Sequence, residues 1–149
     1  MLKTINGGQM ATKGTKHSAC VDLYANADCT IYNGTTVKVP LGVAIDEELM
    51  LTTLRAMHPD EVEPESNYYL VVEPRSSLRL KGLIAGSGII DMDYISSEIN
   101  IILQYNGDKP FEIKKGDRIA QVTVLKHFVH LLGVTTDEER SGGFGSTGQ

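Results

Sequence analysis

Short apolar runs alternate with glycine, asparagine and proline turns along almost the whole chain. The strand-like runs cover residues 19–25, 30–39, 41–45, 68–72, 99–105, 111–113 and 119–129. Many short strands at such spacing are typical of sandwiches and barrels. The pattern predicts an all-β fold, and a length of 149 residues fits one domain over residues 1–149. Within it, Asn33–Gly34 predicts a two-residue hairpin turn with positive φ at both positions.

One segment, residues 46–66, departs from this strand pattern. Apolar side chains recur at helical spacing behind the capping candidate Asp46, and Pro59 should end the helix. The apolar positions are Leu49, Met50, Leu54 and Met57. An acidic stretch at 60–66 then predicts a loop, so the segment is expected to be a helix-plus-loop insertion.

Charge and composition exclude several classes of protein. The formal net charge is −5, so the broad basic surface that binds polymeric nucleic acid is not expected. A small anion remains possible, because a few cations and backbone N–H groups are enough to bind one. Cys20 and Cys29 show no metal-type spacing and predict reduced thiols. The absence of a signal-like N-terminus and of a 20-residue apolar run predicts a cytoplasmic protein without a membrane partner, in the host cytoplasm if the source is a phage or virus.

Two polar stretches in the middle of the chain contain the residues most suited to binding and catalysis. In the first, Arg75 offers a planar fork of donors, and the hydroxyls of Ser76 and Ser77 can complete an anion cradle. In the second, the carboxylate Asp91 stands close to Tyr94 and can act as a base. Asp93 competes for that role, because alternation places it on the same face as Asp91.

These two stretches, residues 74–82 and 88–94, closely resemble the trimeric dUTPases, the dUTP diphosphatases. Three further stretches, 19–23, 115–121 and 140–148, fit the same family, so the resemblance covers most of the chain. It implies a jelly-roll-like β-barrel or sandwich subunit that forms a homotrimer, with each site built from three subunits. It also implies Mg²⁺-dependent hydrolysis of dUTP to dUMP and pyrophosphate, which keeps uracil out of DNA and supplies dUMP for dTMP synthesis.

The resemblance implies a role for each motif residue. Asp91 falls on the carboxylate that activates water, and Tyr94 falls on the ring that packs against deoxyribose. Asp22 falls on the residue that holds the water shell of Mg²⁺, and Arg118 is expected to brace the structure by ion pairing.

The uracil edge would be read by the backbone of Gly88, Ile89 and Ile90. The phosphates would be bound by Arg75, Ser76, Ser77, Gln121 and Arg140. A flexible C-terminal arm, 140–149, would close over the substrate with Phe144, Gly145, Ser146 and Thr147.

Four departures from the family pattern are visible. Cys20 stands where the first motif usually has glycine. The family's Tyr-x-Gly-Glu is one residue longer here, over 94–98, so the turn after Tyr94 must differ locally. The arm is one residue shorter between Arg140 and Phe144. The 46–66 insertion replaces a brief turn and is expected to be a solvated excursion or, alternatively, a surface for a protein partner.

Two other functions remain open at this stage. A dCTP deaminase shares the fold and two of the motifs, but Gln104 stands where deaminases carry a glutamate, and an amide cannot serve as a general base. A regulatory protein could instead use the nucleotide pocket as a switch without turnover.

Overall fold

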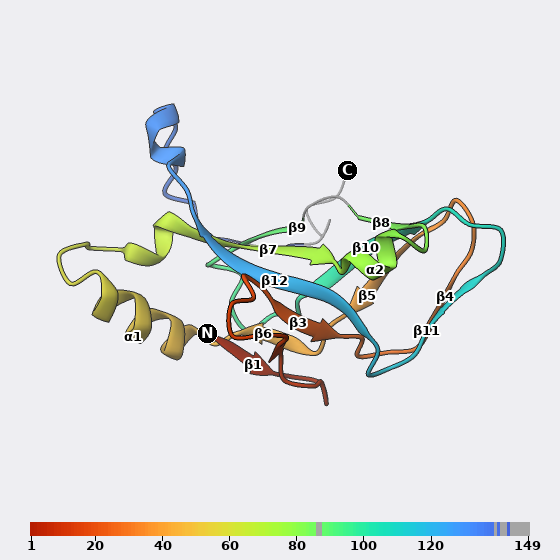
Figure 1. Ribbon diagram of the computed structural model, residues 1–149. Helices are drawn as coiled ribbons and strands as arrows, with labels where there is room; N and C mark the ends of the chain where they lie inside the picture. The colour runs from red at the N-terminus through yellow and green to blue at the C-terminus, as the bar shows by residue number, and fades with distance from the viewer. Residues whose placement is uncertain (86–87, 139, 141–142, 144–149) are drawn as a thin grey trace.

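A five-stranded antiparallel sheet organises the computed structural model, which describes residues 1–85, 88–138, 140 and 143 (Figure 1). Its strands, in spatial order, are β2 (Thr12–Lys13), β3 (Val21–Tyr24), β12 (Arg118–Lys126), β7 (Tyr68–Pro74) and β9 (Gly88–Asp91). The register sets Gln121 of β12 opposite both Asp22 and Glu73, and sets Tyr69 of β7 opposite Asp91. Residues opposite each other share a face. The pairing therefore brings polar residues from three strands side by side.

Three smaller antiparallel sheets complete the β structure of the described residues. They pair β5 (Thr36–Pro40) with β10 (Asn100–Tyr105) and β8 (Leu83–Ile84), β1 (Leu2–Thr4) with β6 (Val43–Ile45), and β4 (Cys29–Ile31) with β11 (Phe111–Ile113). Their apolar faces meet that of the large sheet in one continuous core. Fully buried members of this core include Leu23, Ile31, Leu41, Ile45, Leu83, Ile99, Leu103, Ile113 and Ile119. The predicted mostly-β fold is confirmed.

The hairpin predicted at Asn33–Gly34 is wrong. β4 pairs with β11 and β5 pairs with β10, so the two flanking strands belong to different sheets. Gly34 has a φ of 72°, but Asn33 does not adopt the positive φ that the predicted turn requires. The Gly34 N–H donates instead to the carbonyl of Tyr105, at 2.8 Å. The chain crosses from one sheet to the next at this turn.

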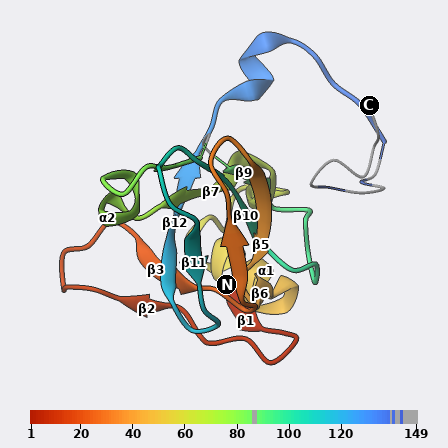
Figure 2. The ribbon, with the colours of Figure 1, turned by 90° about the vertical axis from the view of Figure 1, so that its right-hand side faces the viewer.

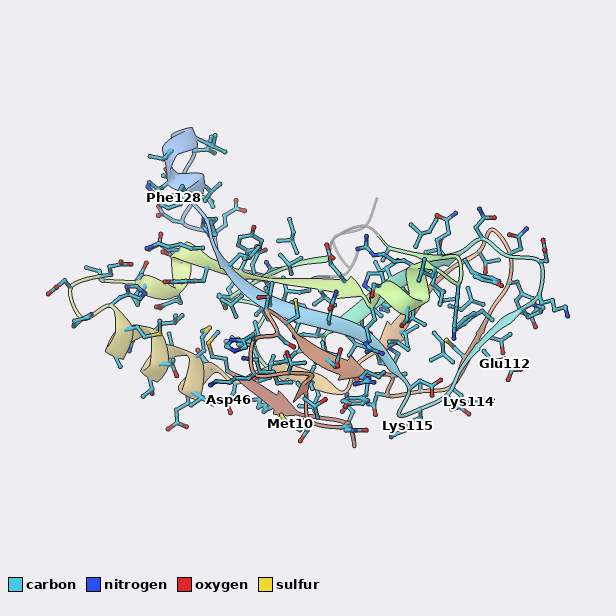
Figure 3. All side chains as sticks on the ribbon, in the orientation of Figure 1. Met10, Asp46, Glu112, Lys114, Lys115 and Phe128 are labelled. Atoms are coloured by element: carbon cyan, nitrogen blue, oxygen red, sulfur yellow. The ribbon has the colours of Figure 1, made fainter. Side chains whose placement is uncertain are left out.

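The predicted helix is present as α1 (Glu47–Met57), at the edge of the molecule (Figures 1 and 3). The Asp46 carboxylate accepts from the Leu49 N–H at 3.1 Å. Such a cap contributes about 1 kcal/mol. Met50 and Leu54 are buried, whereas Leu49 and Met57 are 49% and 63% exposed, so the buried stripe is narrower than predicted. The expected loop after α1 contains the short 3₁₀ helix η1 (Pro64–Asn67). Within the described residues, no helix combines the length and apolar character needed to cross a bilayer.

The last strand, β12, ends at Lys126, three residues before the predicted end. The chain continues through a second 3₁₀ helix, η2 (Val129–Leu132), which extends beyond the sheets (Figure 2). Phe128 lies at the base of this extension (Figure 3). Five apolar side chains of the segment are exposed, namely Phe128, Val129, Leu131, Leu132 and Val134.

Candidate active site

A pocket of about 360 Å³ opens where β3, β12 and the end of β7 meet. Its lining contains four predicted site residues, which come from three separate motifs: Asp22, Arg75, Ser76 and Gln121. The β3–β12 register explains part of this meeting, because Asp22 and Gln121 are direct cross-strand partners. We call this the phosphate-side pocket. Its other lining residues are Gly14, Ser18, Ala19 and Cys20.

Asp22 is buried, and its carboxylate forms ion pairs with two arginines. Its Oδ1 lies 3.0 Å from Arg75 Nε, and its Oδ2 accepts from Arg118 Nη1 at 3.2 Å. The ion pairing predicted for Arg118 is confirmed. Two guanidinium groups around one carboxylate leave a local excess of positive charge, which suits an anionic ligand.

The predicted hydroxyl-rich turn is the one-turn helix α2 (Ser76–Arg79). Arg75 is extended, with φ −64° and ψ 147°, and Leu78 is buried beneath the turn. Ser76 and Ser77 are both exposed, and of the two Ser76 lines the phosphate-side pocket. The structure therefore brings Arg75 into contact with Asp22 and places Ser76 in the same pocket.

A second pocket, of about 190 Å³, lies over β9 and the turn that follows it. We call it the nucleoside-side pocket, and its lining contains the predicted Gly88, Ile89, Ile90, Asp91, Tyr94 and Arg140, together with Ile102 and Gly143. The Tyr94 N–H donates to the Asp91 carbonyl at 3.1 Å, which holds the ring close to the carboxylate. Sequence reasoning missed Ile102. The available signal was an apolar residue at an exposed position of the alternating strand β10.

Arg140 lies against the two competing carboxylates of this pocket. Its Nη2 donates to Asp91 Oδ2, and its Nε donates to Asp93 Oδ1 at 2.6 Å. These carboxylates, Asp93 first, raise the pKa of Arg140, so the guanidinium stays charged. Asp91 and Asp93 are equally exposed, but Asp91 lines the pocket while Asp93 holds Arg140 from the adjoining turn.

Arg140 does not line the phosphate-side pocket, and its contact with a phosphate stays a prediction. Arg140 lies in the nucleoside-side pocket, away from Asp22, Arg75 and Gln121. The other predicted arm residues, Phe144, Gly145, Ser146 and Thr147, lie outside the described residues.

Asp91 and Arg75, one from each pocket, are far apart on one chain. Asp91 is the cross-strand partner of Tyr69, and Arg75 follows six residues later along β7. At about 3.3 Å per residue this separates the two backbones by roughly 20 Å. The Arg75 side chain moreover points to Asp22.

A family model described as dUTPase matches residues 6–148, nearly the whole chain. The chain belongs to the dUTPase family. The deoxyuridine 5′-triphosphate nucleotidohydrolase of Candida glabrata is 34% identical over 148 residues, covering 95% of this chain and 90% of that protein. The mitochondrial human enzyme of the same name is 35% identical over 143 residues, covering 93% of this chain and 50% of its own length.

Solved dUTPases share the fold. The dUTPase of Streptococcus mutans superimposes with a TM-score of 0.67 at 23% identity, over 85% of this chain and 95% of that one. The dUTPase of Staphylococcus aureus phage phi11 gives 0.64 at 15% identity, over 98% and 97%. At these identities the likeness concerns the fold alone.

The turn after Tyr94, where a local departure from the dUTPase pattern is predicted, has an unusual backbone. Ser96 adopts the left-handed conformation, with a φ of 57°, in the turn that is one residue longer than the dUTPase pattern. The Ser96 N–H donates to the Ile45 carbonyl at 3.3 Å, and Ile95 bridges Ile45. The longer turn is thus tied to the residue that precedes the α1 cap.

The donor set of the phosphate-side pocket fits the hydrated Mg²⁺ that the dUTPase motif implies. Its lining contains a carboxylate, Asp22, and no group of three or more His, Cys, Asp or Glu side chains occurs within residues 1–85, 88–138, 140 and 143. Mg²⁺ keeps several waters and binds through one or two carboxylates together with substrate phosphates. Because both Asp22 oxygens are paired with arginines, Mg²⁺ would enter with the triphosphate and meet Asp22 through its waters.

Proposed function

We propose that this chain hydrolyses dUTP to dUMP and pyrophosphate with Mg²⁺, at a site formed by two pockets from different copies of the chain. Membership of the dUTPase family supports the reaction. The separation of Asp91 from Arg75 supports the shared site, because one triphosphate cannot lie against both residues of a single chain.

The nucleoside-side pocket supplies the general base and the groups that select the substrate. Asp91 orients a water and accepts its proton as the water attacks the α-phosphorus. Tyr94 packs against deoxyribose and leaves no room for a 2′-hydroxyl. The backbone of Gly88, Ile89 and Ile90 reads the uracil edge and excludes the thymine methyl by a clash.

The phosphate side supplies positive charge and position. Arg75, Ser76 and Gln121 bind the triphosphate, with Ser77 and the arm residue Arg140 adding donors. Asp22 orients the waters of Mg²⁺, which neutralises charge on the phosphates when it is bound. Positioning and electrostatics of this kind supply most of the rate enhancement in phosphoryl chemistry.

A homotrimer is the assembly that we propose. It would bring the nucleoside-side pocket of one copy to the phosphate-side pocket of the next. The exposed apolar segment 128–134 supports contact with another copy, because so many adjacent apolar side chains are rarely left in water. A cytoplasmic location and a protein partner at the 46–66 insertion stay predictions.

Pyrophosphate release from dUTP, dTTP, dCTP and UTP, each with Mg²⁺, tests the proposed reaction. We expect turnover of dUTP alone. Ammonia release from dCTP would instead indicate a deaminase, although Gln104 is exposed on β10 and does not line the nucleoside-side pocket. Binding of dUTP without turnover would favour the regulatory function and contradict the proposal.

A further inference from the structure

Glu98 joins three distant segments of the chain through one carboxylate. Its Oε1 accepts from the Gly42 N–H at 2.8 Å and from Asn26 Nδ2 at 3.1 Å. Its Oε2 accepts from Asn6 Nδ2 at 2.8 Å. Hydrogen bonds to an ionised acceptor are the stronger kind, so three of them fix this half-buried side chain.

The surroundings of this carboxylate leave little freedom to move. Gly42 has a φ of 64°, and a Cβ placed on it would lie 2.4 Å from the Gly8 Cα, so the two backbones are in direct contact. Asn26 Nδ2 also donates to the Asn6 carbonyl at 3.1 Å. The groups that donate to Glu98 are therefore themselves fixed in position by neighbouring backbone.

The backbone of Glu98 contacts Tyr94, which lines the nucleoside-side pocket. Its carbonyl accepts from the Tyr94 hydroxyl at 3.3 Å and from Asn100 Nδ2 at 2.7 Å. The other end of Tyr94 is bound to the Asp91 carbonyl. Glu98 thus sets the hydroxyl end of the ring that lines the pocket, while Asp91 sets its backbone.

The long turn between Tyr94 and Glu98 makes such an anchor necessary. Ser96 carries a left-handed backbone, and the chain passes one residue more than the family pattern before it reaches Glu98. An extra residue adds conformations to the loop that bears the tyrosine. A carboxylate that accepts three hydrogen bonds restricts the loop at its Glu98 end.

We propose that Glu98 is a positioning residue for sugar discrimination. Through its carboxylate it fixes the carbonyl that orients Tyr94, and so keeps the ring where a 2′-hydroxyl is excluded. The inference rests on the proposed function, because it takes Tyr94 to face the deoxyribose.

The test is Glu98→Gln, which replaces one acceptor oxygen by an amide NH₂ group that donates and cannot accept. We expect the ratio of kcat/KM for dUTP to that for UTP to fall about tenfold, the scale of one lost hydrogen bond. Affinities for non-hydrolysable dUTP and UTP analogues should show the same fall without any dependence on turnover. Glu112→Gln is the matched control, because this exposed glutamate pairs only with Lys114 among the salt bridges of the described residues (both labelled in Figure 3).

Tyr94→Phe separates positioning from general destabilisation. If Glu98 acts through the Tyr94 hydroxyl, the double variant Glu98→Gln/Tyr94→Phe should discriminate no worse than the poorer single variant. A purely structural role would lower kcat/KM for both nucleotides equally and leave the ratio unchanged. That unchanged ratio, or additive losses in the double variant, would overturn the proposal.

Asn6→Gly keeps the proposal testable if Glu98→Gln does not fold. Asn6 is exposed and has a φ of 52°, which glycine adopts freely, so the change removes a donor to Glu98 without backbone strain. We expect the ratio to fall by about threefold, and an unchanged ratio would contradict the proposal.

Absence of dUTP turnover and binding in the unsubstituted protein would be a failure of the proposed function itself. Normal dUTP turnover with unaltered discrimination in the variants would refute only the role of Glu98.

Discussion

Asp91→Asn is expected to lower kcat for dUTP by about 10²- to 10⁴-fold while nucleotide binding is retained. An amide of the same shape keeps the pocket filled but cannot accept the proton of the attacking water. The measurement is kcat from pyrophosphate release, together with the affinity for a non-hydrolysable dUTP analogue.

Asp93→Asn is the matched control for this variant. Asp93 is as exposed as Asp91 and also accepts from Arg140, so it tests whether the ion pair with Arg140 is what matters. We expect kcat to change little in Asp93→Asn. Equal losses in both variants, or near wild-type kcat in Asp91→Asn, would remove Asp91 from the role of base.

Arg75→Ala should reduce kcat/KM for dUTP by about 10- to 100-fold, the equivalent of one or two charge-assisted hydrogen bonds to phosphate. The loss should appear for dUTP but be small for binding of deoxyuridine, which has no phosphate. Arg79→Ala is the control, because Arg79 ends the short helix α2 that follows Arg75 and pairs with Glu73 at 3.0 Å outside the pocket. An exposed pair of this kind contributes about 0–1 kcal/mol, so activity should stay near that of the unsubstituted protein. Unchanged kcat/KM in Arg75→Ala would mean that the triphosphate binds elsewhere.

Features encoded by neighbouring residues were predictable from the sequence. The α1 helix follows from apolar spacing and the Asp46 cap, both of which act within a few residues. The abnormal turn after Tyr94 was visible as a missing glycine and an extra residue, and the structure places the left-handed Ser96 there. The hairpin at Asn33–Gly34 failed because β4 and β5 each have a distant partner, β11 and β10, that local turn preference cannot reveal.

The candidate site likewise combines features that the sequence predicts with contacts between distant residues that it does not. Motif resemblance selected Asp22, Arg75 and Gln121, and the cross-strand register explains why Asp22 and Gln121 meet. It did not reveal Ile102, which lines the pocket from another strand. Nor did it reveal that three donors bind the Glu98 carboxylate, because these donors lie from 56 to 92 positions away in the chain. Nor did it indicate that Arg140 would lie against Asp91 within one chain.

The most direct test of the shared site is activity after the two impaired variants, Asp91→Asn and Arg75→Ala, are co-expressed with different tags and purified as mixed assemblies. In a ring of three, every mixed assembly contains one site with an intact Arg75 from one copy and an intact Asp91 from the next. We therefore expect mixed trimers to recover about one third of the activity of the unsubstituted protein. No recovery in mixed assemblies of confirmed composition would place both residues in the site of a single chain and contradict the account.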